Sequence, residues 1–166
     1  NSGEPKDTMG ILHRCRDNRL TIIHKLKIQN PDFDLHSCDS DFGIDGLNDD
    51  EKVLLEGTIQ NRDLLRQALQ ELEKDAPDHD LIGQLFSEHH SVLRDVLNVS
   101  TPKIDSMLEG ALEAGALGGK IVGSGGGGCM FAYAPENSDV VAEAIEKAGG
   151  KSYIIEPTEG SRNLTS

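Results

Sequence analysis

The feature that most constrains this chain is a run of small residues, GSGGGGC, which spans Gly123–Cys129 between two short apolar stretches. Only glycine tolerates several consecutive positions with a positive φ angle or a close approach of two backbones. The run therefore predicts a tight turn between two strands. Such a turn can bring several amide N–H groups to one point without side chains in the way, as a bound phosphate or another anion requires. A purely structural strand connection is the alternative interpretation.

Two common phosphate-binding motifs do not fit this run. No Lys-Ser or Lys-Thr pair follows the glycines, as a P-loop requires, and the spacing is not the G-x-G-x-x-G of a dinucleotide-binding βαβ unit. The turn is therefore a candidate anion site of another kind. Its candidate ligand-binding residues are Gly123, Ser124, Gly125, Gly126, Gly127 and Gly128.

The remaining pattern predicts an alternation of helices and short strands. Apolar residues at helical spacing, together with helix start and stop signals, predict helices over Met9–Lys27, Glu51–Lys74, Asp80–Leu97, Pro102–Ala114 and from Asn137 or Ser138 to Ala148. Apolar runs with β-forming residues predict strands over Lys120–Val122, Cys129–Ala134 and Lys151–Ile155, the first two as an antiparallel hairpin. Acidic and turn-forming residues make 30–50 a surface loop or insertion.

These elements favour an α+β fold in one domain that covers residues 1–166. In the C-terminal half of the chain, the predicted order of helices and strands is α-β-β-α-β. One further strand immediately before Asn1 would complete a ferredoxin-like split β-α-β antiparallel sheet, with the additional N-terminal helices packed on one side. Because the first residue is Asn1 and not Met, we expect the native start of the protein to lie upstream.

Composition and charge exclude several classes of protein. The net charge is −13, from 29 acidic and 16 basic residues, which would repel a nucleic-acid backbone. No apolar run is long enough to span a bilayer, so we expect no membrane partner. The three cysteines are odd in number and irregularly spaced, unlike those of small secreted domains, which favours a reducing cytoplasm.

Three segments together resemble one known family. Gly118–Ala134 resembles the third conserved motif of the GHMP kinase superfamily, which is a strand, a glycine-rich turn and a second strand. Ser87–Asp105 is similar to a segment of the galactokinase branch in which an acidic residue, a histidine and Leu-Arg-Asp precede Val-Ser-x-Pro-x-x-Asp. Ser2–Thr8 resembles the galactokinase stretch that enters the C-terminal domain. The resemblance spans almost the whole chain and is weakest over 30–50.

This resemblance implies the C-terminal part of an ATP-dependent kinase, of the galactokinase-like sugar kinase type, that phosphorylates a hydroxyl of a small metabolite. The cleft between two domains would hold ATP and Mg²⁺, and Gly123–Gly128 would line it. In such kinases the phosphate-binding motif and the aspartate proposed as catalytic base lie in the N-terminal domain. That domain is therefore the expected partner, this chain holds no catalytic residue, and alone it should be inactive.

Two non-catalytic functions remain as alternatives. A ferredoxin-like domain can act as a ligand-binding or regulatory module, because fold alone does not fix function. A kinase-like protein can also have lost catalysis and act as a sugar sensor.

Four other features have structural or coincidental interpretations. Asp41-Phe42-Gly43 matches the protein-kinase DFG triplet without its companion motifs. Asp41, Asp45 and Gly46 fall at EF-hand positions, but Gly43 and Lys52 replace ligands. The pairs His13/Cys15 and His36/Cys38 carry zinc-ligand chemistry, although residues two apart on a helix point to nearly opposite sides. We expect no metal site.

The predicted helix over Asp80–Leu97 carries four polar residues with two interpretations each. His89 and His90 lie in or beside its apolar stripe, where a histidine is more often a hydrogen-bonded structural residue than a ligand or base. Arg94 and Asp95 can form a solvated ion pair, and an arginine beside a nucleotide cleft can also attract phosphate. The structural role is favoured for all four.

Overall fold

The computed structural model describes residues 1–5, 8–38 and 45–156. In chain order, its elements are α1 Thr8–Gln29, α2 Asp49–Leu72, α3 His79–Ser91, the π-helical turn η1 Val92–Val96, α4 Pro102–Glu113, β1 Gly118–Val122, β2 Cys129–Tyr133 and α5 Ser138–Lys147. The expected α+β class is confirmed, and so are the five predicted helical regions, with ends that differ by a few residues.

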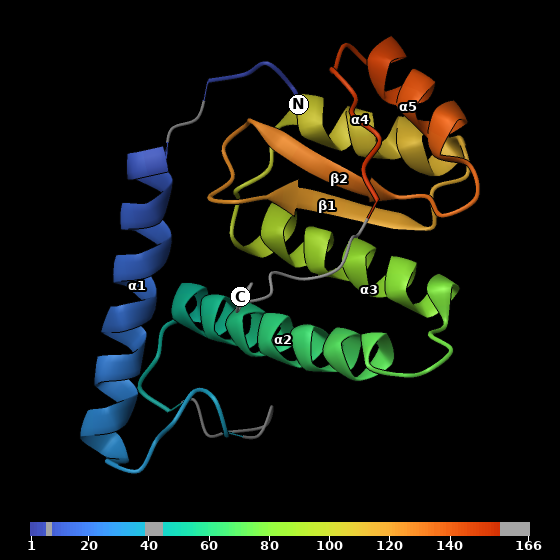
Figure 1. The fold of residues 1–166 in the computed structure, drawn as a ribbon. Coiled ribbons are helices and arrows are strands. Elements are labelled where there is room, and N and C mark those ends of the chain that lie inside the picture. Colours follow the sequence, from blue (N-terminus) through green and yellow to red (C-terminus); the bar gives the residue numbers. More distant parts are fainter. Residues whose placement is uncertain (6–7, 39–44, 157–166) are drawn as a thin grey trace, which may run out of the picture.

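The two strands form the predicted antiparallel hairpin, and the glycine-rich run joins them. Gly118 pairs with Tyr133 at one end and Val122 with Cys129 at the other. Figure 1 shows α4 behind the strands and the turn at the end of the sheet nearest α1. Ile121 and Met130, which are directly opposite each other, are buried on the sheet.

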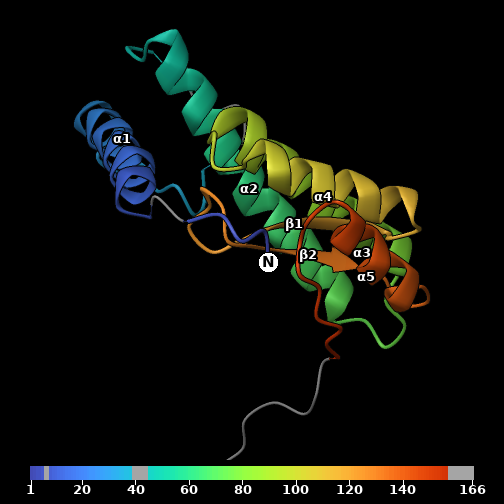
Figure 2. The same cartoon turned by 90° about the horizontal axis from the view of Figure 1, so that it is seen from above.

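Helix α4 supplies the centre of the main core. Ile104, Met107 and Ala111 are 0% exposed and share one cluster with Val141 and Ile145 of α5. Full burial of an aliphatic side chain of this size contributes roughly 1.5–3 kcal/mol. Figure 2, seen from above, shows α4 running along the strands, with α5 beside it.

Helix α3 lies against the edge of β1 with almost no space between the two backbones. A Cβ atom added at Gly118 would lie 1.8 Å from the carbonyl oxygen of Gly83, and one added at Gly83 would lie 2.3 Å from that of Leu117. Glycine is required on both elements for this approach. The contact fixes the position of the hairpin relative to α3.

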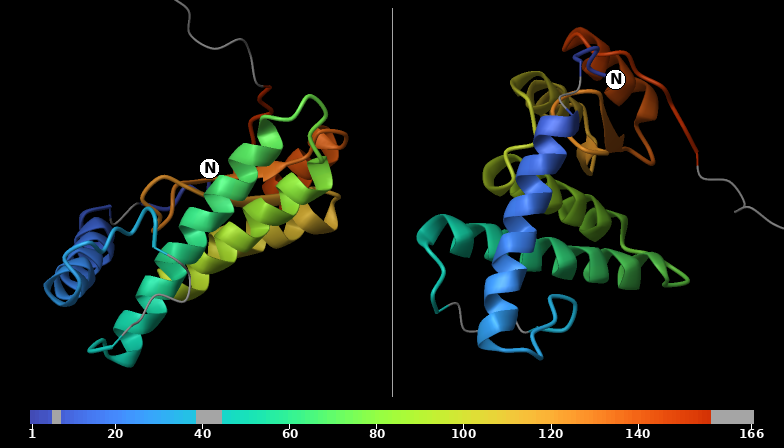
Figure 3. Two further views of the ribbon diagram at one scale, coloured as in Figure 1. Left: turned by 90° about the horizontal axis from the view of Figure 1, so that it is seen from below. Right: turned by 90° about the vertical axis from the view of Figure 1, so that its left-hand side faces the viewer.

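Helix α1 crosses α2 steeply and forms a second cluster with it (Figure 3). The cluster contains Ile22, Leu26, Leu55 and Ile59 together with Phe33 and Leu47. The last two residues belong to the predicted loop 30–50, whose described part has no helix or strand before α2. They are 3% and 6% exposed, so this loop is anchored in the core at two points.

Helix ends follow the local chemistry of the sequence. Asn48 and Glu51 form a reciprocal capping box at the start of α2, and Thr101 accepts a hydrogen bond from the Ile104 amide at the start of α4. Gly115, predicted as the stop of α4, has φ +98°.

The single helix predicted over Asp80–Leu97 is wrong in its last turn. After Ser91 the backbone widens into the π-helical turn η1, in which the Leu97 amide donates to the Val92 carbonyl. The hydrophobic pattern of the sequence cannot distinguish this widened turn from an α-helical one. Asn98 follows with φ +50°, the one positive value at a non-glycine residue among those described.

The strand predicted over Lys151–Ile155 is also wrong for the described chain, whose sheet contains β1 and β2 alone. The Lys151 amide donates to the Asn1 carbonyl, and the Asn1 amino group donates to the Lys151 carbonyl, both at 2.8 Å. Beyond Lys151, Tyr153 and Ile155 are exposed. β-Forming residues become a strand only where a neighbour completes the ladder.

The first two residues of the chain lie between β2 and Lys151. Asn1 pairs with Lys151 on one side, and the Ser2 amide donates to the Gly128 carbonyl on the other at 2.7 Å. Hydrogen bonds that successive residues make to opposite sides are typical of a central strand. The strand expected immediately before Asn1 stays a prediction.

Candidate functional site

The glycine-rich turn has a backbone that no other residue type would adopt easily. Five of its six positions have φ in the left-handed region: Gly123 (+82°), Gly125 (+82°), Gly126 (+71°), Gly127 (+108°) and Gly128 (+82°). An L-residue there costs roughly 1–2 kcal/mol per position. Ser124 is the single residue of the six with a side chain, and it is half-buried.

One side of the turn rests on the loop that precedes α4. The Gly126 amide donates to the Val99 carbonyl at 2.7 Å. A Cβ atom added at Gly125 would lie 2.5 Å from the same carbonyl oxygen. The N–H of Gly126 is therefore already used within the fold, which leaves the other amides of the turn as the candidate donors to a ligand.

The other side of the turn contacts the N-terminal segment. A Cβ atom added at Gly127 would lie 3.1 Å from the Cβ of Glu4 and 3.2 Å from the Pro5 carbonyl oxygen. The Thr101 hydroxyl donates to the Glu4 carboxylate at 2.6 Å. The turn is thus held between two segments that are about a hundred residues apart in the sequence.

The N-terminus of α1 meets the turn at Ser124. The Ser124 hydroxyl donates to the Thr8 hydroxyl at 3.4 Å, and Thr8 is the first residue of α1. The first turn of α1 carries no acidic residue. A helix of 22 residues carries a partial positive charge at this end. This partial charge favours an anion beside Ser124, whereas the Glu4 carboxylate on the other side of the turn opposes one.

The sequence analysis missed two residues of this arrangement, Thr8 and Glu4. Each lies at least 115 positions before the turn in the sequence, and no local pattern links them to it. The resemblance of Ser2–Thr8 to the galactokinase stretch that leads into the C-terminal domain was the one signal that drew attention to this segment. The six candidate residues Gly123–Gly128 do lie together, because they are contiguous.

His90 is a structural residue in the described chain. It is 6% exposed, its Nε2 lies 3.1 Å from Asp105 Oδ1, and its Nδ1 accepts a hydrogen bond from the Ile121 amide at 3.3 Å. Burial lowers the pKa of His90, although the Asp105 carboxylate opposes this shift. A neutral ring satisfies both contacts, with the proton on Nε2.

His89, Arg94 and Asp95 do not contribute to the turn. Burial, with Lys120 and His90 nearby, lowers the pKa of His89 to about 4. Arg94 and Asp95 form a two-pronged ion pair at 2.7 and 3.0 Å on the surface, in agreement with the solvated pair favoured by the sequence. No contact described for Arg94 reaches Gly123–Gly128.

The two histidines predict that acid destabilises the chain before its carboxylates are protonated. In the unfolded chain both titrate near 6.5, whereas in the folded chain their pKa values are lowered, to about 4 for His89. The unfolded state therefore binds more protons between these values. The contribution of the two histidines to the free energy of unfolding should be constant above about pH 7 and fall towards pH 4, by about 3 kcal/mol for His89.

Urea unfolding at several pH values from about 7.5 to about 4.5 measures this loss. In His89→Asn, the free energy of unfolding should fall markedly less with decreasing pH than in the wild type. A stability that rises on acidification over this interval would contradict the assignment.

The metal hypotheses gain no support from the described residues, where no three His, Cys, Asp or Glu side chains cluster as a metal ion requires. His13 pairs with Asp17 at 3.0 Å, and the Cys15 thiol faces the Leu97 carbonyl at 3.7 Å. Cys38 contacts Arg62. Asp41-Phe42-Gly43, and with it the start of the EF-hand pattern, lies outside the described residues.

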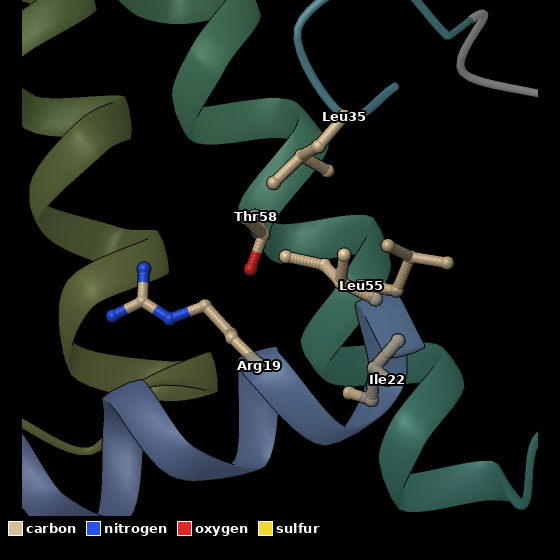
Figure 4. Close-up of a pocket in the computed structure, with 6 residues that line it drawn as sticks. Arg19, Ile22, Leu35, Leu55 and Thr58 are labelled. Atoms are coloured by element: carbon tan, nitrogen blue, oxygen red, sulfur yellow. The ribbon is translucent and has the colours of Figure 1, made fainter. Parts of the chain in front are cut away.

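Two pockets in the described part of the chain lie away from the turn. Figure 4 shows the smaller, between α1 and α2, where Arg19 and Thr58 meet Ile22, Leu35 and Leu55. Its volume of about 10 Å³ suits no metabolite. The larger, about 330 Å³, is lined on α2 and α3 by residues that include Glu56, Asp63 and Glu88. These carboxylates would repel a phosphate.

Within residues 1–5, 8–38 and 45–156, no helix has the length and apolar character that crossing a membrane requires.

Comparisons with known proteins agree on one family. The family model described as "GHMP kinases C terminal" matches residues 65–151. The mevalonate kinase of Thermococcus gammatolerans is 51% identical over 75 residues, which are 45% of this chain and 22% of that protein. The galactokinase of Streptomyces coelicolor is 30% identical over 141 residues, which are 79% of this chain and 36% of that protein.

A solved structure shares the fold. Lactococcus lactis galactokinase, in a complex with galactose, superposes with a TM-score of 0.75 at 19% sequence identity, over 89% of this chain and 39% of that one. The likeness agrees with the expected fold class. This chain spans about a fifth to two fifths of the length of these relatives.

Proposed function

The chain belongs to the GHMP kinases, through their C-terminal domain, and on that premise we propose that it lines an ATP-dependent phosphoryl-transfer site. Residues 1–166 form one domain of the enzyme, and the partner is its own N-terminal kinase domain. The acceptor is a hydroxyl of a small metabolite. Nucleic acid and membranes are not partners in this proposal, which agrees with the net charge of −13.

The observation that carries the proposal is the meeting of the glycine turn with the N-terminus of α1. Within the described residues, the amides of Gly123, Ser124, Gly125, Gly127 and Gly128 donate to no other backbone group, and the hydroxyls of Ser124 and Thr8 lie beside them at the N-terminus of α1. Gly123, Ser124 and Gly128 are at least partly exposed, whereas Gly125 and Gly127 are buried. Such a set of donors stabilises phosphate oxygens, whose charge grows or shifts during phosphoryl transfer. The ligand would be the phosphate chain of ATP or an anionic group of the acceptor.

The N-terminal domain would supply the other requirements of the reaction, among them the Mg²⁺ site. Mg²⁺ needs oxygen ligands in octahedral geometry, and the described residues offer no cluster of carboxylates at the turn. Mg²⁺ would thus bind through the phosphates of ATP and through groups of the N-terminal domain. What this chain contributes is the positioning of an anionic group and the exclusion of water from that side.

Two acceptors are supported by different observations. A galactose-type sugar is favoured by the galactokinase match, which covers 79% of this chain. Mevalonate is favoured by the 51% identity over 75 residues. Assays of the complete enzyme with MgATP and each acceptor in turn decide between them, because the cognate acceptor should have the larger kcat/KM by at least about 10²-fold. Turnover of neither acceptor would argue against both assignments.

The chain of residues 1–166 alone should not catalyse phosphoryl transfer. A turnover needs metal, triphosphate and acceptor aligned together, and a single glycine turn supplies part of one of these requirements. The check is a coupled assay of ADP release with purified chain, MgATP and a panel of sugars and mevalonate. Phosphorylation clearly above the blank would overturn this prediction.

The two non-catalytic alternatives differ from the kinase in what they bind. A regulatory module would be stabilised by an amino acid or another effector, and a sugar sensor by sugar without turnover. Thermal unfolding with MgATP, sugars, mevalonate and amino acids separates them, because a ligand of the folded state raises Tm. The kinase proposal expects MgATP to give the rise in the complete enzyme, together with turnover of one acceptor.

A further inference from the structure

The carboxylate of Asp105 joins two separate supports of the glycine turn. Asp105 lies in the first turn of α4, and its side chain is 23% exposed. Its Oδ1 lies 3.1 Å from His90 Nε2 and 2.5 Å from the Ser100 hydroxyl. Neither contact reaches the turn itself, so these two side-chain contacts can affect a ligand there only indirectly, through His90 and Ser100.

The first support is strand β1, which enters the turn. His90 accepts a hydrogen bond from the Ile121 amide, two residues before Gly123. Because His90 is 6% exposed, its orientation depends on the protein groups around it. A buried imidazole that donates to a carboxylate has both its tautomer and its ring plane fixed. Asp105 thus fixes the ring that holds β1 at its last buried residue.

The second support is the loop on which the turn rests. Ser100 donates to Asp105, and the preceding residue, Val99, accepts the Gly126 amide. This loop follows η1 and contains Asn98 at φ +50°. A π-helical turn and a left-handed residue are costly local conformations that persist where the surroundings hold them. The Ser100–Asp105 contact is one of the interactions that hold them here.

We propose that Asp105 is a positioning residue for the anion-binding turn, acting through His90 on β1 and through Ser100 on Val99. This inference rests on the proposed function, because it assigns a role in ligand binding at the same turn. The carboxylate sets the spacing between Ile121 and Val99, and therefore the direction in which the free amides of the turn point. Asp105 does not touch the ligand, and it is not a catalytic residue.

The proposal predicts that different variants shift different amide resonances, a pattern that loss of stability alone would not produce. In ¹H–¹⁵N spectra of the labelled chain, Ser100→Ala should shift the Gly126 amide resonance and leave that of Ile121 in place. His90→Gln should do the reverse, and Asp105→Asn should shift both. Glu113→Gln, an exposed carboxylate at the other end of the same helix, is the matched control and should shift neither.

Binding is measured in the same spectra by titration with MgATP. Asp105→Asn and Ser100→Ala should raise the apparent Kd by about tenfold, as the loss of a charge-assisted hydrogen bond allows, and Glu113→Gln should keep the wild-type value. If His90→Gln does not fold, Ser100→Ala and Asp105→Asn still test the proposal.

Wild-type Gly126 and Ile121 resonances in Asp105→Asn, or an unchanged Kd, would overturn the positioning role. A complete enzyme that does not respond to MgATP at all would instead refute the proposed function, and the amide shifts of the variants would still report whether Asp105 positions the turn.

Discussion

Replacing Gly118 with alanine is expected to destabilise the chain by about 3 kcal/mol or more. The added methyl group would lie 1.8 Å from the Gly83 carbonyl oxygen, and its next nearest neighbours are also backbone atoms of Gly83. No side-chain rotation relieves such a clash, so α3 and β1 must separate. Urea unfolding followed by circular dichroism should show a lower midpoint with an unchanged slope.

Gly110→Ala is the matched control for this experiment. Gly110 lies in α4, and its added Cβ would be 3.7 Å from the nearest atom, the Ala144 carbonyl oxygen, which is an ordinary contact. Alanine is the better helix former by up to about 1 kcal/mol, so this variant should be as stable as the wild type or more so. Equal stabilities of Gly118→Ala and Gly110→Ala would contradict the close contact of α3 with β1.

Replacing Gly125 with alanine is expected to weaken anion binding at the turn by at least about tenfold. Gly125 has φ +82°, and its added Cβ would lie 2.5 Å from the Val99 carbonyl oxygen that holds the Gly126 amide. Strain and clash together should cost about 3 kcal/mol, and the relaxed turn would no longer direct its amides to one point. Titration with MgATP should show at least about a tenfold weaker response, and urea unfolding measures the stability.

Gly149→Ala is the matched control, because it introduces similar backbone strain at a position away from the turn. Gly149 has nearly the same φ, +83°, but its added Cβ would meet only the end of the Lys103 side chain, at 3.7 Å. This variant should lose about 1 kcal/mol of stability and keep the wild-type response to MgATP. A Gly125→Ala chain that binds as well as Gly149→Ala would argue against a ligand at the turn.

The helices and the hairpin could be predicted because their signals are local. Thr101 and Pro102 mark the start of α4, Gly115 its end, and the change of apolar period after it marks β1 and β2. The glycine turn was found for the same reason, since its backbone conformation is encoded in consecutive residues. These are the features for which tertiary contacts agree with local preference.

The errors concern features that depend on distant partners. Lys151–Ile155 has the composition of a strand, but its pairing stops at Asn1, so the segment lies outside the sheet. Phe33 was assigned to a surface loop and is buried because α1 and α2 leave an apolar surface that it covers. The pairing of Thr8 with Ser124 also depends on the folded arrangement, which no spacing in the sequence encodes.

The central claim is that the turn between β1 and β2 binds an anionic group with its amides. The most direct measurement is a titration of the ¹⁵N-labelled chain with MgATP and, separately, with inorganic phosphate. The account predicts that the amide resonances of Gly123, Ser124, Gly125, Gly127, Gly128 and Thr8 shift most. If those resonances stay in place in the folded chain while both ligands are added, or if the largest shifts fall elsewhere, the claim is contradicted.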